Sequence, residues 1–139
     1  NVIVGFPGED DADLDELERF LVAARLDVVG VFGYSDEDGT EAESLDGKLD
    51  RDEVDLRVAQ VSRLVDELCA QRAEDRVGQQ VQVLVEHSGV DGVEGRAEHQ
   101  GPEVDGTTTV TGHRADVGTV VAARVVAAEG VDLVAEGVG

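Results

Sequence analysis

Two turns that follow apolar stretches are the first places in this sequence where a ligand could be bound. Residues 3–9 (IVGFPGE) run from an apolar stretch into a glycine-rich turn and then into acidic residues. Residues 34–40 (YSDEDGT) follow the next apolar stretch in the same way. Glycines let the backbone approach a flat or phosphorylated ligand at the carboxyl end of a parallel strand. Taken alone, each segment is better explained as a tight turn or a solvated acidic loop.

Metal binding and nucleophilic catalysis find little support in the spacing of the residues that would carry them. His87, His99 and His113 are far apart in the sequence and have no cysteine neighbours, so they lack zinc-site spacing. Cys69 is the only cysteine, which excludes an internal disulfide and any cluster built from several thiolates of this chain. We therefore expect no catalytic residue and no metal ligand here, and Cys69 is expected to be a semi-buried, inert thiol.

The net charge of the chain limits the kinds of molecule that it can bind. The 139 residues include 32 acidic and 11 basic ones, which gives a net charge of -21. Such a chain repels phosphates, so free nucleic-acid binding and polybasic membrane attachment are excluded. No apolar run approaches the roughly 18 residues of a membrane span, and the first residues lack the features of a signal peptide. A cytoplasmic location is the expectation.

The predicted secondary structure changes near Val77, from alternating strands and helices to strands alone. Apolar runs at residues 2–6 and 28–32 flank a helical pattern that contains Leu14, Leu17 and Leu21. This order predicts a parallel strand–helix–strand unit. A capping signal at residues 50–53 then opens a long helix that runs to about residue 76.

Beyond Val77 the sequence turns to Val, Thr and Gly with strand periodicity. Five short strands are predicted between residues 81 and 135, enough for a small closed or nearly closed antiparallel barrel of the OB type. The predicted fold class is therefore α/β followed by all-β, with domains at residues 1–77 and 78–139. The first part carries a net charge of -14 and the second -7.

Together these motifs resemble the methylthiotransferase branch of the radical S-adenosylmethionine enzymes. The resemblance rests on residues 3–9, on residues 31–35 (VFGYS) and on Gly39-Thr40, and from residue 76 onward the chain looks like a TRAM domain. It implies that residues 1–77 are the last part of a radical S-adenosylmethionine (βα) barrel with a connecting helix. It also implies that residues 78–139 are an OB-like TRAM barrel.

Two branches of this family compete. The tRNA-modifying, MiaB-like members usually carry an arginine in the loop after Tyr-Ser, then Gly-Thr-Pro-Ala, whereas this loop is acidic and lacks both the arginine and the proline. The RimO-like members carry an acidic loop there and a TRAM segment of the form Gln-x-Pro-Glu-x-Asp-Gly, which is present at residues 100–106. The resemblance thus favours the branch that methylthiolates an aspartate of the basic small-subunit ribosomal protein S-twelve.

The family's cofactors are S-adenosylmethionine and two 4Fe–4S clusters, whose cysteine ligands this chain does not contain. The resemblance places Ile3 and Gly5 at the adenosine part of the cofactor and Tyr34 and Ser35 near its adenine. Glu9 is expected to cap a helix.

We expect the acidic TRAM loop to contact the ribosomal protein or the small ribosomal subunit, with no direct RNA binding. The contacts are expected from Gln100, Glu103 and Asp105. The chain is then an inactive C-terminal fragment of the enzyme. The alternatives are a fragment of a MiaB-like tRNA enzyme and a stand-alone acidic binding module.

Overall fold

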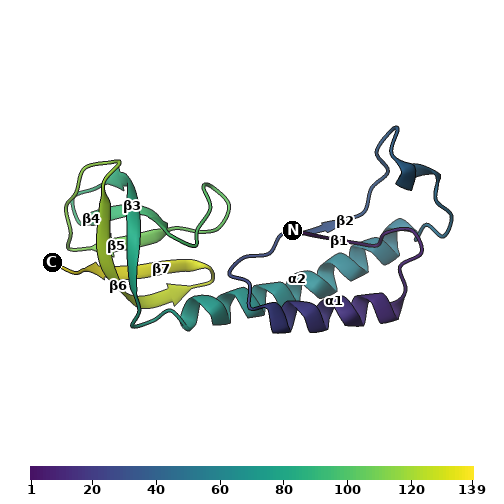
Figure 1. The fold of residues 1–139 in the computed structure, drawn as a ribbon, viewed down its shortest axis with the longest axis horizontal. Coiled ribbons are helices and arrows are strands. Elements are labelled where there is room, and N and C mark those ends of the chain that lie inside the picture. Colours follow the sequence, from purple (N-terminus) through teal and green to yellow (C-terminus); the bar gives the residue numbers. More distant parts are fainter. The chain divides into compact units, whose positions relative to one another are not determined.

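The computed structural model describes all residues of the chain, which form two compact units, Asn1–Leu68 and Cys69–Gly139 (Figure 1). The first unit is α/β, and its helix α2 continues into the second. The elements of the first unit are β1 (Val2–Val4), α1 (Asp11–Ala24), β2 (Val31–Gly33), a 3-10 helix (Glu41–Ser44) and α2 (Arg51–Glu74). The second unit holds β3 (Gln80–Ser88), β4 (Gly92–Ala97), β5 (Thr108–Thr111), β6 (Val120–Glu129) and β7 (Asp132–Gly137).

The first unit confirms the predicted parallel strand–helix–strand arrangement. β1 and β2 pair in parallel, with Val2 opposite Val31 and Val4 opposite Gly33. Helix α1 begins at a capping box, in which Asp10 accepts from the backbone of Asp13 while Asp13 accepts from the backbone of Asp10. This satisfies N–H groups that have no partner within the helix.

Helix α2 contributes more buried hydrophobic side chains to the first unit than any other element does. Its buried side chains include Val54, Val61 and Val65, which lie seven and four residues apart along one stripe of the helix. Asp50 caps the helix by accepting from the amide of Glu53 at 2.9 Å. The predicted helix over residues 50–76 is thus confirmed to within two residues.

The second unit is a closed five-stranded barrel, with strand order β3-β4-β5-β7-β6 and β6 pairing back to β3. Its core is almost wholly Val, Ala and Leu, and Val83, Val110 and Leu133 are at most 1% exposed. The predicted five strands are all present.

The prediction that this barrel is antiparallel is wrong, because β5 and β7 run in parallel, with Thr108 opposite Leu133. The reason is topological. β6 and β7 form a hairpin, and closing the barrel brings β7 rather than β6 beside β5. Hydrophobic alternation fixes which residues face inward, but it does not specify which non-consecutive strands become neighbours. The barrel is therefore mixed.

The boundary between the two units follows Leu68, earlier in the chain than the change from helical to strand sequence near Val77. Ala73, near the end of α2, is 5% exposed and belongs to the barrel's hydrophobic core. Packing therefore assigns the last turn and a half of α2 to the barrel unit, whereas the change from helical to strand sequence comes after it. For the radical S-adenosylmethionine barrel segment expected at residues 1–77, the structure shows one two-stranded parallel sheet and no barrel. Neither helix is long and apolar enough to cross a membrane.

Candidate ligand pocket and acidic barrel loop

A pocket of about 380 Å³ lies at the carboxyl ends of β1 and β2. Three of the four residues predicted to bind a cofactor, Ile3, Tyr34 and Ser35, line it. The structure therefore brings together residues that are 31 positions apart, as expected for neighbouring parallel strands. The remaining lining residues are mainly apolar or aromatic: Phe6, Phe32, Gly33, Glu37, Thr40 and Ala42. We call this the strand-end pocket.

Gly5, the fourth predicted residue, does not line the pocket. Its amide is engaged within the protein, since it donates to both carboxylate oxygens of Glu9 at 3.0 Å. Its φ of +78° favours glycine, and a Cβ at this position would lie 2.8 Å from a methyl group of Val54. Gly5 thus shapes the turn that carries Phe6 into the pocket.

The walls of the pocket are held by an aromatic pair and a polar chain. The rings of Phe6 and Tyr34 meet edge to face, with centroids 5.4 Å apart. The Tyr34 hydroxyl donates to Asp36 at 2.7 Å, and Lys48 Nζ donates to the same carboxylate at 2.7 Å. The hydrogen bond to Asp36, reinforced by burial and by the charge of Asp36, raises the pKa of Tyr34 to about 12.

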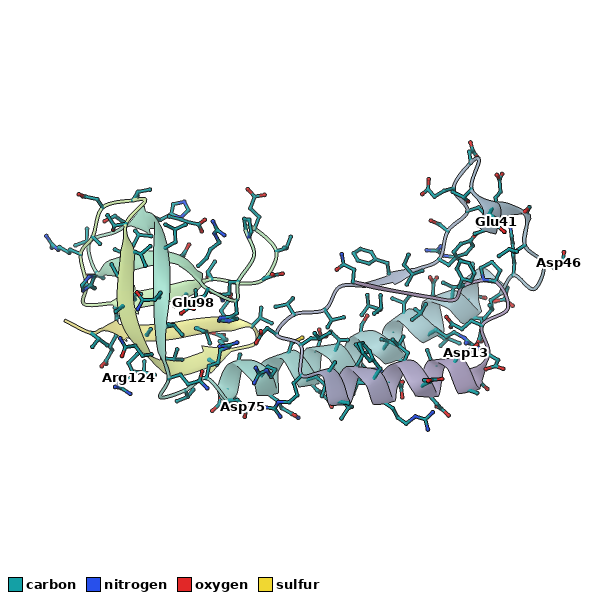
Figure 2. The ribbon with its side chains drawn as sticks, in the orientation of Figure 1. Asp13, Glu41, Asp46, Asp75, Glu98 and Arg124 are labelled. Carbon is teal, nitrogen blue, oxygen red and sulfur yellow. The ribbon has the colours of Figure 1, made fainter.

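The loop that follows Tyr34 carries acidic groups into solvent, among them Glu41 and Asp46 (Figure 2). Lys48 is the single basic residue between Tyr34 and Asp50. Its ammonium group binds both Asp36 and the carbonyl of Glu43, at 2.7 Å in each case. The hydrogen bonds from Lys48 and then from Tyr34 lower the pKa of Asp36. One cation thus fixes the loop beside the strand-end pocket.

A buried arginine that the sequence analysis did not identify is connected, through Glu9, to the turn that follows β1. Arg57 is 7% exposed and donates to Glu9 and Glu53 at 2.9 Å and to Asp11 at 3.2 Å. A signal for it was available, because Arg57 comes three residues after Val54 on the apolar stripe of α2. A charged residue on such a stripe must be paired, since an isolated buried charge is very costly.

Glu9, expected to cap a helix, does not do so, because Asp10 is the N-cap of α1. Its side chain is instead 12% exposed and lies between the Arg57 guanidinium and the amide of Gly5. The acidic residues before α1 therefore have different roles, since Asp10 caps the start of the helix and Glu9 fixes the turn.

In the barrel, Gln100 is a structural residue at the root of the 100–106 loop. It is 3% exposed, and its amide oxygen accepts from Ala97 N at 2.9 Å and from the Thr108 hydroxyl at 2.7 Å. Its amide nitrogen donates to the carbonyls of Thr107 and Val131. All its hydrogen-bonding capacity is used inside the barrel, so the predicted side-chain contact between Gln100 and a partner protein is not compatible with this arrangement.

Glu103 and Asp105, the other two predicted contact residues, differ from Gln100 in lying at the surface of the loop. Glu103 is exposed and has a φ of +69°, while Asp105 is half-buried and accepts from Gly101 N at 2.8 Å. Between them Val104 is 76% exposed. The loop thus presents an apolar side chain between two carboxylates, on a base fixed by Gln100.

No group of three or more His, Cys, Asp or Glu side chains is arranged to hold a metal ion. Cys69 is buried and is the single thiol of the chain, whereas an iron–sulfur cluster is held by several thiolates. The residues of this chain therefore do not fit a cluster.

Comparison with known proteins identifies both parts of the chain. The TRAM domain family matches residues 77–138. The whole chain is 66% identical to the ribosomal protein uS12 methylthiotransferase RimO of Saccharopolyspora erythraea, with 100% of this chain and 29% of that protein aligned. The RimO of Nocardioides sp. is 64% identical over 96% of this chain, and that of Streptomyces avermitilis 62% identical over 98%.

The chain spans a little under one third of the length of these curated relatives, 28–29% in each case. The part that it matches is their C-terminal region. Its barrel, whose strands begin at Gln80, occupies the residues matched by the TRAM family. The chain is therefore a C-terminal region of the RimO-like methylthiotransferase family, ending in a TRAM domain.

Proposed function

We propose that this chain is the C-terminal part of an enzyme that methylthiolates an aspartate of ribosomal protein uS12 in the cytoplasm. The observation that carries the proposal is the identity of 62–66% over nearly the whole chain to relatives named for this activity. The exposed apolar side chains of the small sheet support a place within a larger protein. Ile3 is 60% exposed and Phe32 55%, and such surfaces are commonly covered by further protein.

In this proposal the strand-end pocket forms part of the S-adenosylmethionine site. Its aromatic and apolar lining suits the flat adenine, and the hydroxyl of Ser35 and the backbone of Tyr34 offer polar contacts. Ile3 supplies an apolar contact to the adenosine part. S-adenosylmethionine, when bound to a reduced cluster, supplies the radical chemistry of the reaction. The cluster ligands would lie outside this chain, which alone is expected to be inactive.

The coding sequence on the 5′ side of the Asn1 codon tests this part of the proposal. We expect it to encode a CxxxCxxC motif, the spacing of the cluster cysteines in this family. An upstream reading frame without clustered cysteines would contradict the enzyme assignment. The acidic-binding-module alternative would then be favoured.

We further propose that the TRAM domain recruits uS12. Residues 78–139 carry a net charge of -7, and no lysine is present among them. Such a surface attracts a basic protein and repels RNA. Glu103 and Asp105 are the contact residues in this proposal, with Val104 between them, while Gln100 holds the loop in position.

Binding of purified uS12 to the 139-residue chain tests the role of the loop. The double variant Glu103→Gln/Asp105→Asn should weaken binding by about five- to tenfold, because it removes two charges from the contact. The matched control is Asp91→Asn/Asp116→Asn, which removes two exposed charges from other barrel loops. Equal weakening by both pairs would show that net charge, and not this loop, determines binding.

A further inference from the structure

Arg57 forms ion pairs with Glu9, Asp11 and Glu53, and we call these four residues the Arg57 cluster. One guanidinium, almost completely removed from solvent, uses its three nitrogen atoms on separate acceptors. Nε donates to Glu53, Nη1 donates to Glu9 and to the carbonyl of Asp10, and Nη2 donates to Asp11. Burial alone would lower the pKa of Arg57, but the hydrogen bonds that it donates to Glu53 and Glu9 outweigh this effect, and the net result is a raised pKa. The arginine is therefore a fixed positive centre between α2 and the start of α1.

The cluster continues from Arg57 to the strand-end pocket through Glu9. The same Glu9 oxygen that accepts from Arg57 at 2.9 Å also accepts from the amide of Gly5 at 3.0 Å. Gly5 is the first residue of the turn after β1, and the next residue, Phe6, lines the pocket. On the other side of the turn the amide of Gly8 donates to the carbonyl of Gly47 at 2.8 Å.

Phe6 depends on this turn for its place in the pocket wall. Its ring is 43% exposed and its aromatic contact is edge to face with Tyr34. A half-exposed ring is held weakly by its own packing, so the backbone that carries it decides where it lies. A change at Arg57 is therefore transmitted to the pocket without Arg57 itself touching a ligand.

We propose that Arg57 is a positioning residue for the strand-end pocket. It orients the Glu9 carboxylate, which holds the Gly5 amide and thereby places Phe6 against Tyr34. The proposal rests on the proposed function in one respect, the identity of the ligand as S-adenosylmethionine. The placing of the turn by Arg57 does not depend on that identity.

Arginine is required because the acceptors lie in different directions. A lysine has one ammonium group and cannot reproduce three separate guanidinium contacts. Arg57→Lys keeps the charge but should release Glu9, whereas Arg57→Met keeps only the apolar stem. Glu9→Gln retains an oxygen that accepts from Gly5 but loses the charge that pairs with Arg57. Arg51→Met is the matched control, because Arg51 lies on the same helix with an exposed ion pair to Asp55.

The first measurement is made by NMR on the full 139-residue chain. Arg57→Met and Arg57→Lys should accelerate hydrogen exchange of the Gly5 amide by about tenfold or more. They should also abolish the nuclear Overhauser contact between the Phe6 and Tyr34 rings. Arg51→Met should change neither, and Glu9→Gln should accelerate exchange of Gly5 less than Arg57→Met does. Protected amides in the middle of α1 and α2 report that the first unit of each variant is folded; if Arg57→Met unfolds the first unit, Glu9→Gln and Arg57→Lys decide the question.

The second measurement uses the complete methylthiotransferase that carries this chain. Arg57→Lys should raise KM for S-adenosylmethionine by about tenfold while kcat changes less than twofold, because ground-state positioning is what is lost. Retention of the Gly5 protection and the ring contact in a folded Arg57 variant would overturn the positioning role. Loss of both with an unchanged KM would overturn its bearing on the ligand. An unchanged KM in Tyr34→Ala would count against the proposed cofactor pocket, and the NMR result would still decide the role of Arg57.

Discussion

The barrel of the second unit buries large apolar side chains, whereas the small sheet of the first unit leaves some of its own exposed to solvent. The barrel buries Val83, Val110 and Leu133 almost completely, and every one of its strands has two neighbours. The sheet has two strands, each with one unpaired edge. All three phenylalanines of the chain lie in this unit and are at least 43% exposed: Phe6, Phe20 and Phe32.

If the proposed function is correct, this difference places stability and ligand binding in different parts of the chain. Closure of the barrel gives every strand a hydrogen-bonded neighbour on both sides, and it allows a core to form from small aliphatic residues alone. A two-stranded sheet has neither advantage and depends on the helices that cover it. The strand-end pocket lies on the less protected element, as is usual for binding sites.

The largest expected effect comes from truncating a core side chain of the barrel. Leu133→Ala should lower the free energy of unfolding of the barrel by about 2–5 kcal/mol, because it leaves a cavity in a closed core. Phe32→Ala removes a larger side chain, but one that is 55% exposed, and should cost less than about 1.5 kcal/mol. Chemical denaturation followed on barrel and sheet resonances separately measures both. A larger cost for Phe32→Ala would reverse the comparison.

Hydrogen exchange measures the same contrast without mutation. Amides in β3 and β6 should exchange at least about a hundredfold more slowly than those in β1 and β2, because opening of the sheet needs less disruption. Exchange followed by NMR at residue resolution gives both sets of rates in one sample. Equal, strong protection in both would show that the sheet is as stable as the barrel.

Gln100 sharpens the comparison within the barrel itself. Gln100→Leu should destabilise the barrel by about 1–3 kcal/mol, since it leaves the Ala97 amide and the Thr108 hydroxyl without their acceptor. Gln100→Glu retains an acceptor oxygen and serves as the partner variant. Thermal unfolding compares them, and an unchanged stability for Gln100→Leu would return Gln100 to the list of candidate contact residues.

The smallest effect is local to the pocket and concerns ionisation. Tyr34 is the single tyrosine of the chain, so its absorbance near 295 nm reports one group. The titration midpoint should lie near pH 12, and Asp36→Asn should move it toward the ordinary value of 10.0. Because the pKa is raised in the folded state, the associated stabilisation is present below pH 10 and is lost as the pH rises through 12. An unshifted midpoint would mean that the hydrogen bond to Asp36 does not persist in solution.

Sequence patterns predicted the parts of the fold that depend on local periodicity. The stripe that contains Val54, Val61 and Val65 predicted α2, and two apolar runs predicted the parallel pair β1 and β2. Ile3, Tyr34 and Ser35 line one pocket, because the carboxyl ends of adjacent parallel strands meet at one edge of the sheet, and their contact with a cofactor stays a prediction. The pairing of β5 with β7 was out of reach, since it depends on how the barrel closes.

The site was incomplete for a related reason. Glu9 and Arg57 are 48 residues apart, and neither the spacing nor the composition of either segment indicates their contact. Similarly, the place of Gln100 in the motif at residues 100–106 suggested a contact with a partner, whereas its four hydrogen bonds are to groups within the barrel. Gln100 was thus taken for a surface residue and Arg57 was not identified, and both are buried polar side chains with several hydrogen-bond partners.

The most direct test of the account is a pair of equilibrium titrations of the 139-residue chain, one with uS12 and one with tRNA, at low and high salt. We predict that uS12 binds, that its affinity falls as salt screens the acidic barrel, and that tRNA does not bind. Tight, salt-sensitive binding of tRNA together with no binding of uS12 would contradict the assignment and favour a tRNA-modifying relative.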